Sequence, residues 1–183
     1  MKRKIKYLLR KLRALSYFKY NINKVVYGVD CYFGRGVNLS KGIKLGDYCY
    51  IGQYSYIGPN TIIGNFAIFA DNVNFIGSDH RYDLPATPVI LSGVPDNQPQ
   101  TVIGDDVWLG HGVTIMRGIK IGNGAIVAAN SVVTKNIPAY EVWAGIPARK
   151  IKERFNEENI LKHENFLESY SKGLIKIKND REK

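Results

Sequence analysis

The sequence has few cysteines, no long hydrophobic run and no acidic residue near its start. Two cysteines among 183 residues are too few for a disulfide scaffold, and they lack metal-ligand spacing. No apolar stretch approaches the roughly 18–20 residues that a membrane span needs. The opening residues, MKRKIKYLLRKLRALSYF, mix charged with apolar positions and contain no small-residue cleavage site. These absences exclude a transmembrane helix and argue against a secretory signal.

The positive charge is confined to one end of the chain. The formal net charge is +10, but residues 1–24 carry nine Lys and Arg and no Asp or Glu. Residues 25–151 carry nine basic and nine acidic residues, and residues 152–183 carry eight and seven. The body of the protein is therefore neutral, which argues against a nucleic-acid-binding face.

A period of six residues organises the neutral part of the chain. Large apolar residues recur at every sixth position in two runs, and a glycine or another small residue usually follows each one. These apolar positions are Tyr27, Phe33, Leu39, Leu45, Ile51, Ile57, Ile63, Phe69 and Phe75, then Ile103, Leu109, Ile115, Ile121, Val127 and Val133. Four places after each comes a small or β-branched residue, such as Cys31, Cys49 or Val107.

Two inward residues in every six predict short strands separated by tight corners. Three such strands close a triangular coil of 18 residues, and coils stacked about 4.7–4.9 Å apart form parallel ladders. An α-helix is excluded because a period of six would place apolar residues all round it. Glycine after the large apolar residue relieves backbone crowding. Cys31 and Cys49, 18 residues apart, are expected to stack one coil above the other in the core as inert thiols.

The register is lost between Ile76 and Val102, where GSDHRYDLPATPVILSGVPDNQPQ intervenes. An unstructured stretch of this length is uncommon inside a compact domain and is usually functional. Four of the seven prolines lie in it, so we expect a shaped protrusion over residues 77–100. His80 lies at its root between Asp79 and Asp83. A neutral imidazole can accept a proton near pH 7, and a neighbouring carboxylate can fix its tautomer.

The repeats, together with SDHRYD, TVIGDDVWLG and GAIVAANSVVTK, resemble the hexapeptide-repeat acyltransferases and, among them, the xenobiotic acetyltransferase branch. Sugar and capsular-polysaccharide O-acetyltransferases are built in the same way. The resemblance covers residue 27 to about residue 155. It implies an all-β fold, a left-handed parallel β-helix of about five triangular coils, and His80 as the general base. Handedness enters only through the resemblance, because parallel crossovers are generally right-handed.

The resemblance also implies that acetyl-CoA is the co-substrate. Residues matching the family's pantetheine contacts are Ala129, Thr134 and Lys135, and those matching its phosphate contacts are Arg149 and Lys152, with Lys150 as an extra candidate. Cationic side chains suit phosphates; the alternative is an ordinary solvated helix start. Trp108 walls the groove or packs at a coil edge. His111 is expected to line the cleft, and His163 to be solvated in the charged tail. Three histidines, one of them outside the coils, do not make a zinc site.

The expected reaction is direct attack of an acceptor hydroxyl or amine on the thioester, with His80 removing the proton and backbone N–H groups stabilising the oxyanion. No aromatic residue follows Tyr82 in the loop, which favours a sugar or surface-polysaccharide precursor over a drug. A chloramphenicol- or streptogramin-type acetyltransferase, a sugar-nucleotide N-acetyltransferase and an inactive repeat scaffold remain open. The outward tyrosines either stack on sugar rings or line a subunit interface; these are Tyr48, Tyr50, Tyr54 and Tyr56.

The division expected from the sequence is a basic amphipathic segment over 1–24, the β-helix over 25–151, and a charged C-terminal helix or tail over 152–183. The first segment either caps the first coil or docks on an anionic membrane surface. The resemblance implies a homotrimer with active sites between subunits. Use of a CoA thioester implies a cytoplasmic, reducing location.

Overall fold

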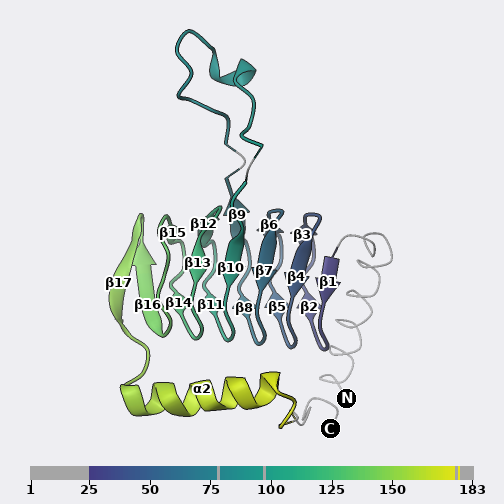
Figure 1. Cartoon of the computed structure of the whole chain (residues 1–183), viewed down its shortest axis with the longest axis vertical. Coiled ribbons are helices and arrows are strands. Elements are labelled where there is room, and N and C mark those ends of the chain that lie inside the picture. The colour runs from purple at the N-terminus through teal and green to yellow at the C-terminus, as the bar shows by residue number, and fades with distance from the viewer. Residues whose placement is uncertain (1–24, 78, 97, 176, 178–183) are drawn as a thin grey trace.

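A computed structural model describes residues 25–77, 79–96, 98–175 and 177 of the chain. The amphipathic segment expected over residues 1–24 lies outside the described residues. Within them, short strands wind into a three-sided coil, with a loop projecting from one edge and a helix lying along another (Figure 1). The fold is mostly β, as the six-residue period predicts.

The strands are two or three residues long until the final pair. Their bounds are β1 (Val25–Tyr27), β2 (Tyr32–Phe33), β3 (Asn38–Leu39), β4 (Ile43–Leu45), β5 (Tyr50–Ile51), β6 (Tyr56–Ile57), β7 (Thr61–Ile63), β8 (Ile68–Phe69), β9 (Asn74–Ile76), β10 (Thr101–Ile103), β11 (Trp108–Leu109), β12 (Thr114–Met116), β13 (Lys120–Ile121), β14 (Ile126–Val127), β15 (Val132–Val133), β16 (Glu141–Gly145) and β17 (Ala148–Glu153). A 3-10 turn, η1, spans Val89–Leu91, and helix α2 spans Glu157–Ser171.

Every third strand pairs in parallel with the next, which makes three flat sheets. Sheet A has the order β1-β4-β7-β10-β13, sheet C has β15-β12-β9-β6-β3, and sheet B has β17-β16-β14-β11-β8-β5-β2. Five complete triplets of strands form five coils, and the bridge from Ile121 to Ile137 with strand β16 forms part of a sixth. The predicted parallel β-helix of about five triangular coils is confirmed. We name its edges A–B, B–C and C–A after the sheets that meet there.

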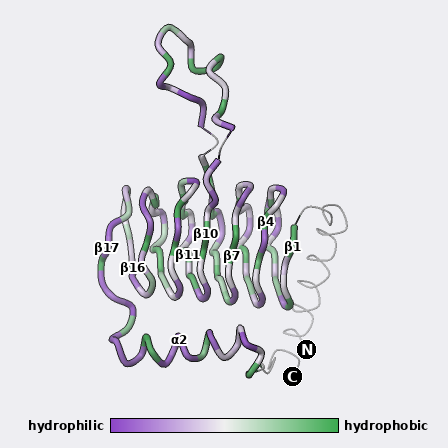
Figure 2. The backbone as a smooth tube through the Cα atoms, viewed as in Figure 1, coloured by the Kyte–Doolittle hydropathy of each residue, from purple (hydrophilic) through white to green (hydrophobic). Residues whose placement is uncertain are grey.

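The core consists of the two inward columns that the repeat defines. The large apolar column is buried from Phe33 to Val133, and the second column, including Cys31 and Cys49, is buried beside it. Both cysteines are free thiols. Tyr27 differs from the prediction because it remains 39% exposed. It lies in β1, the end strand of sheet A, for which β4 is the one pairing strand among the described residues. Hydrophobic and hydrophilic residues alternate along the coils (Figure 2).

Glycine recurs after the large apolar residue because the next coil approaches the backbone there. A Cβ on Gly64 would lie 2.7 Å from the carbonyl carbon of Gly104 and 2.8 Å from the amide nitrogen of Asp105. The left-handed bend itself falls three residues after the column position, for example at Tyr48 (φ 56°) and Phe66 (φ 60°) on the A–B edge. The small residue thus permits close stacking of coils, which is the crowding that the sequence predicts.

A side-chain ladder also joins successive coils along the A–B edge. Asn65 Oδ1 accepts from the Asp47 amide at 2.9 Å, and Asp105 Oδ1 accepts from the Asn65 amide at 2.6 Å. Asn123 Oδ1 then accepts from the Asp105 amide at 3.0 Å. These bonds satisfy corner N–H groups that no strand partner reaches.

The C-terminal part differs in detail from the segment expected over residues 152–183. Residues Lys152 and Glu153 belong to β17, which pairs antiparallel with β16, and the helix begins only at Glu157. The Asn156 side chain caps α2 by accepting from the Asn159 amide at 2.9 Å. No helix among the described residues combines the length and apolar character needed to cross a membrane.

Helix α2 lies along the A–B edge and covers its aromatic corner residues (Figure 1). Tyr170 packs edge-on against Phe66, with ring centroids 4.7 Å apart, and its hydroxyl donates to Asp47 Oδ2 at 2.7 Å. Tyr48 stacks on Phe66 at 5.6 Å. The helix therefore closes one edge of the prism with side chains of the same chain.

Candidate active site

The protruding loop leaves sheet C after β9 and enters sheet A at β10, so it emerges from the C–A edge. It projects well beyond the coils (Figure 1). Its apolar side chains are largely uncovered: Ile90 is 77% exposed, Leu91 74% and Tyr82 88%. The expected protrusion over 77–100 is thus a shaped arm whose apolar residues face outward.

His80 lies in the outgoing limb of this loop, and its ring is half-buried. Its Nδ1 atom is shielded from solvent and has no hydrogen-bond partner among the described residues. The expected carboxylate partner is engaged elsewhere, because Asp83 pairs with Arg81 at 3.3 Å. Hydrogen bonding to Arg81 lowers the pKa of Asp83, which keeps that carboxylate charged. A buried nitrogen with free hydrogen-bonding capacity calls for a partner that the described residues do not supply.

Trp108 lies on the outer face of sheet B and is 51% exposed. Register places it in one row with three other residues: it pairs with Ile126, which pairs with Val142, which pairs with Lys152. Directly paired residues project from the same face of a sheet. Lys152 therefore shares the outer face with Trp108.

The structure separates the three basic candidates of β17. Arg149 pairs with Ala144, two residues from Val142, and so shares the outer face with Lys152; both are exposed. Lys150 is committed to carboxylates instead, since its Nζ donates to Glu141 Oε1 at 2.7 Å and also to Glu153. Hydrogen bonding to Glu141 raises the pKa of Lys150. Of the three, Arg149 and Lys152 remain placed for a phosphate.

His111 and Ala129 occupy matching corners of successive coils on the B–C edge, where both are exposed. The two corners are linked, because the Asn130 amide donates to the His111 carbonyl at 2.7 Å. Thr134 and Lys135 are also exposed, but they follow β15 and so lie on the C–A edge, the edge that carries the loop.

The predicted site residues therefore form two groups on different sides of sheet C. One group, at the C–A edge, comprises His80, Thr134 and Lys135. The other comprises Trp108, His111, Ala129, Arg149 and Lys152, on the outer face of sheet B and the B–C edge. Six extended residues separate neighbouring edges, a span of up to about 20 Å. A site that uses both groups requires the C–A edge of one chain to meet the B–C edge of another.

The prediction that His163 is solvated is wrong. Its Nε2 lies 3.2 Å from Asp106 Oδ2, and its Nδ1 lies 3.0 Å from the Tyr140 hydroxyl. Arg154 reaches the same Asp106 oxygen at 2.8 Å. Burial raises the pKa of Tyr140, so its hydroxyl stays protonated. The charged composition of the tail concealed this part-buried cluster, and the sequence offered no local signal for it.

The four outward tyrosines differ in their surroundings. Tyr48 is covered by α2 of its own chain, so neither sugar stacking nor a subunit interface is needed to explain it. Tyr54 is 54% exposed at the B–C edge. Tyr50 and Tyr56 are half-buried on sheets B and C.

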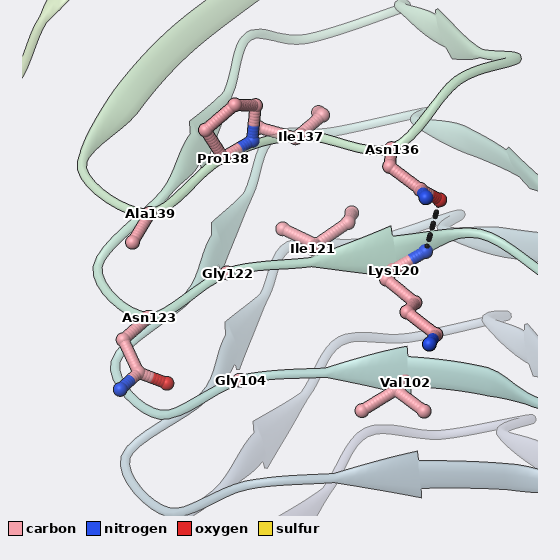
Figure 3. A pocket seen from close by; sticks show the side chains of 10 residues that line it. All are labelled: Val102, Gly104, Lys120, Ile121, Gly122, Asn123, Asn136, Ile137, Pro138 and Ala139. Atoms are coloured by element: carbon pink, nitrogen blue, oxygen red, sulfur yellow. Dashed lines mark hydrogen bonds between the residues drawn. The ribbon is translucent and has the colours of Figure 1, made fainter.

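A groove of about 440 Å³ lies where sheet A ends (Figure 3). Val102, Lys120 and Pro138 are among its lining residues, and the Asn136 side chain accepts from the Lys120 amide at 2.8 Å. None of the residues predicted to contact acetyl-CoA lines this groove. Within the described ranges, no group of three or more His, Cys, Asp or Glu is placed to hold a metal ion.

The stacked coils, built from six-residue units that each contain a short strand, agree with the resemblance to the hexapeptide-repeat acyltransferases. Residues 100–135 match the family "Bacterial transferase hexapeptide (six repeats)". The resemblance to the hexapeptide-repeat acyltransferases is confirmed by this match and by similarity to known acetyltransferases.

A probable macrolide acetyltransferase of Lysinibacillus sphaericus is 43% identical over 109 residues, covering 52% of this chain and 61% of the relative. A maltose O-acetyltransferase structure from Clostridium difficile 630 shares 29% identity with a TM-score of 0.58, covering 71% of this chain and 67% of that one. A hexapeptide-repeat acetyltransferase of Vibrio cholerae O1 biovar eltor, complexed with acetyl coenzyme A, shares 26% identity with a TM-score of 0.62, covering 71% and 72%. The chain spans less than two thirds of the macrolide relative's length.

Proposed function

We propose that this chain is an acetyl-CoA-dependent O-acetyltransferase that acetylates a hydroxyl of a sugar or surface-polysaccharide precursor. The observation that carries the proposal is the His80 imidazole, held on a projecting loop with its Nδ1 shielded and unpartnered among the described residues. The similarity to a maltose O-acetyltransferase and to an enzyme complexed with acetyl coenzyme A supports this donor and acceptor class.

In the proposed reaction, His80 accepts the proton of the acceptor hydroxyl while the oxygen attacks the thioester carbonyl. The new C–O bond forms, the C–S bond breaks, and the proton on His80 passes to the leaving thiolate of CoA. Backbone N–H groups along the cleft stabilise the developing oxyanion. No acyl-enzyme is required, since Cys31 and Cys49 are buried in the core and inaccessible to a thioester.

The proposed active unit is a homotrimer in which the loop of one subunit faces the B–C edge of the next. Three features support it: the separation of the two residue groups, the lone Nδ1 of His80, and the uncovered apolar side chains Ile90 and Leu91 on the loop. A neighbouring chain would supply the missing hydrogen-bond acceptor and cover these side chains.

A drug acceptor is the second candidate, because the macrolide acetyltransferase relative is 43% identical over the matched region. The two candidates are separated by measuring acetyl-CoA-dependent thiol release with sugars, oligosaccharide precursors, macrolides and chloramphenicol-type drugs. Turnover with a sugar alone supports the proposal, and turnover with drugs alone overturns the acceptor class. Absence of CoA binding in calorimetry overturns the enzyme assignment and favours an inactive repeat scaffold.

The His80→Ala variant tests the catalytic assignment on whichever acceptor turns over. We expect a loss of about 10²–10⁴-fold in kcat with CoA affinity retained. Thr87→Ala is the control, because it changes an exposed residue of the same loop outside both groups of site residues and should leave kcat unchanged. Near-normal turnover of His80→Ala would exclude His80 as the base.

A further inference from the structure

The loop that carries His80 emerges between two coils, and residues of both coils contact its root. Along the C–A edge, Asn60 follows β6 in the coil before the loop, and Arg117 follows β12 in the coil after it. Together these two residues flank the opening through which the chain leaves and returns. Arg117 is half-buried at this position.

The returning limb is fixed through Gln98. Its Oε1 accepts from Arg117 Nη1 at 2.8 Å, and its main-chain carbonyl accepts from Asn60 Nδ2 at 3.2 Å. Its Nε2 donates to the Pro95 carbonyl at 2.6 Å. One glutamine is thus bonded to the coils on both sides and to its own limb. A bond to a guanidinium is stronger than one between neutral groups.

The outgoing limb rests on the same arginine. Gly77 has a φ of 119°, and a Cβ there would lie 2.9 Å from the Cβ of Arg117 and 3.0 Å from its amide nitrogen. The chain therefore passes Arg117 in direct contact, three residues before His80. Arg117 touches the outgoing limb with its backbone and Cβ, and it holds the returning limb with its guanidinium.

A second tie joins the limbs immediately beyond His80. The Arg81 amide donates to the Gly93 carbonyl at 2.9 Å, and the Ser92 hydroxyl donates to the Arg81 carbonyl. His80 consequently lies between two sets of contacts that join the limbs: those of Arg117 at the root and the hydrogen bond from Arg81 to Gly93 beyond it. The direction of its imidazole depends on both, since its own Nδ1 is not anchored within the described chain.

We propose that Arg117 and Gln98 are positioning residues for the general base: their contact fixes the angle at which the loop leaves the coil and thereby aims His80. This inference rests on the proposed function of His80. Neither residue contacts the reacting groups in this scheme, so each acts through the imidazole. Displacement of a catalytic group by about 1 Å can cost about 100-fold in rate, which makes the exit angle catalytically important.

The test compares Gln98→Ala with Gln98→Glu, and both with Arg117→Ala, in the full-length protein. Gln98→Ala removes the acceptor for Arg117, whereas Gln98→Glu keeps an oxygen at that place and turns the contact into an ion pair. We expect Gln98→Ala and Arg117→Ala to lower kcat about tenfold or more, with the KM for acetyl-CoA changed less than about twofold. Gln98→Glu should retain most of kcat, and the double alanine variant should be no slower than Arg117→Ala alone.

Lys162→Gln, which removes an exposed cation of helix α2 far from both groups of site residues, is the control and should leave kcat unchanged. Wild-type kcat in Gln98→Ala, or an equal loss in Gln98→Glu, would overturn the positioning role. Gln98 lies outside the coils, so its variants keep the test valid even where Arg117→Ala lowers the melting temperature. Failure of the proposed function is seen separately, as full activity of His80→Ala.

Discussion

His163 Nε2 lies 3.2 Å from the Asp106 carboxylate and so joins helix α2 to the A–B edge of the coils. Asp106 has a left-handed backbone (φ 51°), and its side chain projects toward the helix from the corner itself. The other ring nitrogen of His163 meets the Tyr140 hydroxyl, two corner positions further along the same edge. This one imidazole therefore secures the helix across two corner residues of the coil.

Replacing His163 by Ala should destabilise the protein by about 1–3 kcal/mol, because two part-buried hydrogen bonds are lost and Asp106 keeps only Arg154. The measurement is urea unfolding followed by circular dichroism. Lys162→Ala serves as the control, since Lys162 forms an exposed pair with Glu158 on the outer side of α2 and should cost about 0.5 kcal/mol or less. Equal losses in the two variants would show that the cluster does not hold the helix.

Gly64→Ala should destabilise the β-helix by about 1–3 kcal/mol, because the new methyl group would lie 2.7–2.8 Å from the backbone of the next coil. Thermal unfolding measures the effect. Ser40→Ala is the matched control at the same position of the repeat, where a side chain is already accommodated. A melting temperature for Gly64→Ala equal to that of Ser40→Ala would contradict the close-approach explanation.

The ionised Glu141 side chain should add to the free energy of unfolding, and acid should remove this contribution by protonating it. Burial favours its neutral form, but hydrogen bonds from Lys150 at 2.7 Å and Trp143 at 2.6 Å outweigh burial and lower its pKa below 4.5. The contribution is therefore present above about pH 4.5 and is lost as the pH falls through the lowered folded-state pKa.

In Glu141→Gln this component is absent, so the unfolding free energies of variant and wild type should converge between about pH 7 and about pH 3. Urea unfolding at both pH values checks it. A constant gap between Glu141→Gln and wild type would refute the linkage.

Arg149→Ala and Lys152→Ala should each weaken CoA binding by about tenfold if both contact phosphate groups. Lys150→Ala should weaken it by less than about twofold, because its ammonium group is engaged by Glu141 and Glu153. Calorimetry with CoA provides the affinities, and the losses should shrink as salt is added. An equal loss of CoA affinity in all three variants would contradict the assignment of the phosphate contacts to Arg149 and Lys152.

The fold could be predicted closely from sequence because every coil repeats the same physical requirement. Each six-residue unit must bury two side chains and turn once, so Ile57 or Leu109 can be assigned to the core without knowledge of any distant partner. The burial of Tyr27 was predicted wrongly because the exposure of a residue in an end strand depends on what packs beyond that strand. The repeat also located the loop, which is visible as the one interruption in register.

The candidate site was predictable only in part. Spacing placed His80 at a corner and Trp108 on an outer face, but it could not show that Lys150 faces two carboxylates. That arrangement arises from the antiparallel return of β17 on β16, which lies outside the repeat. The docking of His163 was equally hidden, because a long-range contact between a helix and a coil corner leaves no periodic trace in the sequence.

The hydrogen-bond ladder along the A–B edge continues across the point where the protruding loop is inserted into the chain. Most of its bonds join residues 18 apart, yet the bond from Asn65 to Asp105 spans 40 positions with unchanged geometry. The coils before and after the loop stack directly on each other, as they would if the loop were absent. The length of the arm between its anchored limbs can therefore change without altering how the coils beneath it stack.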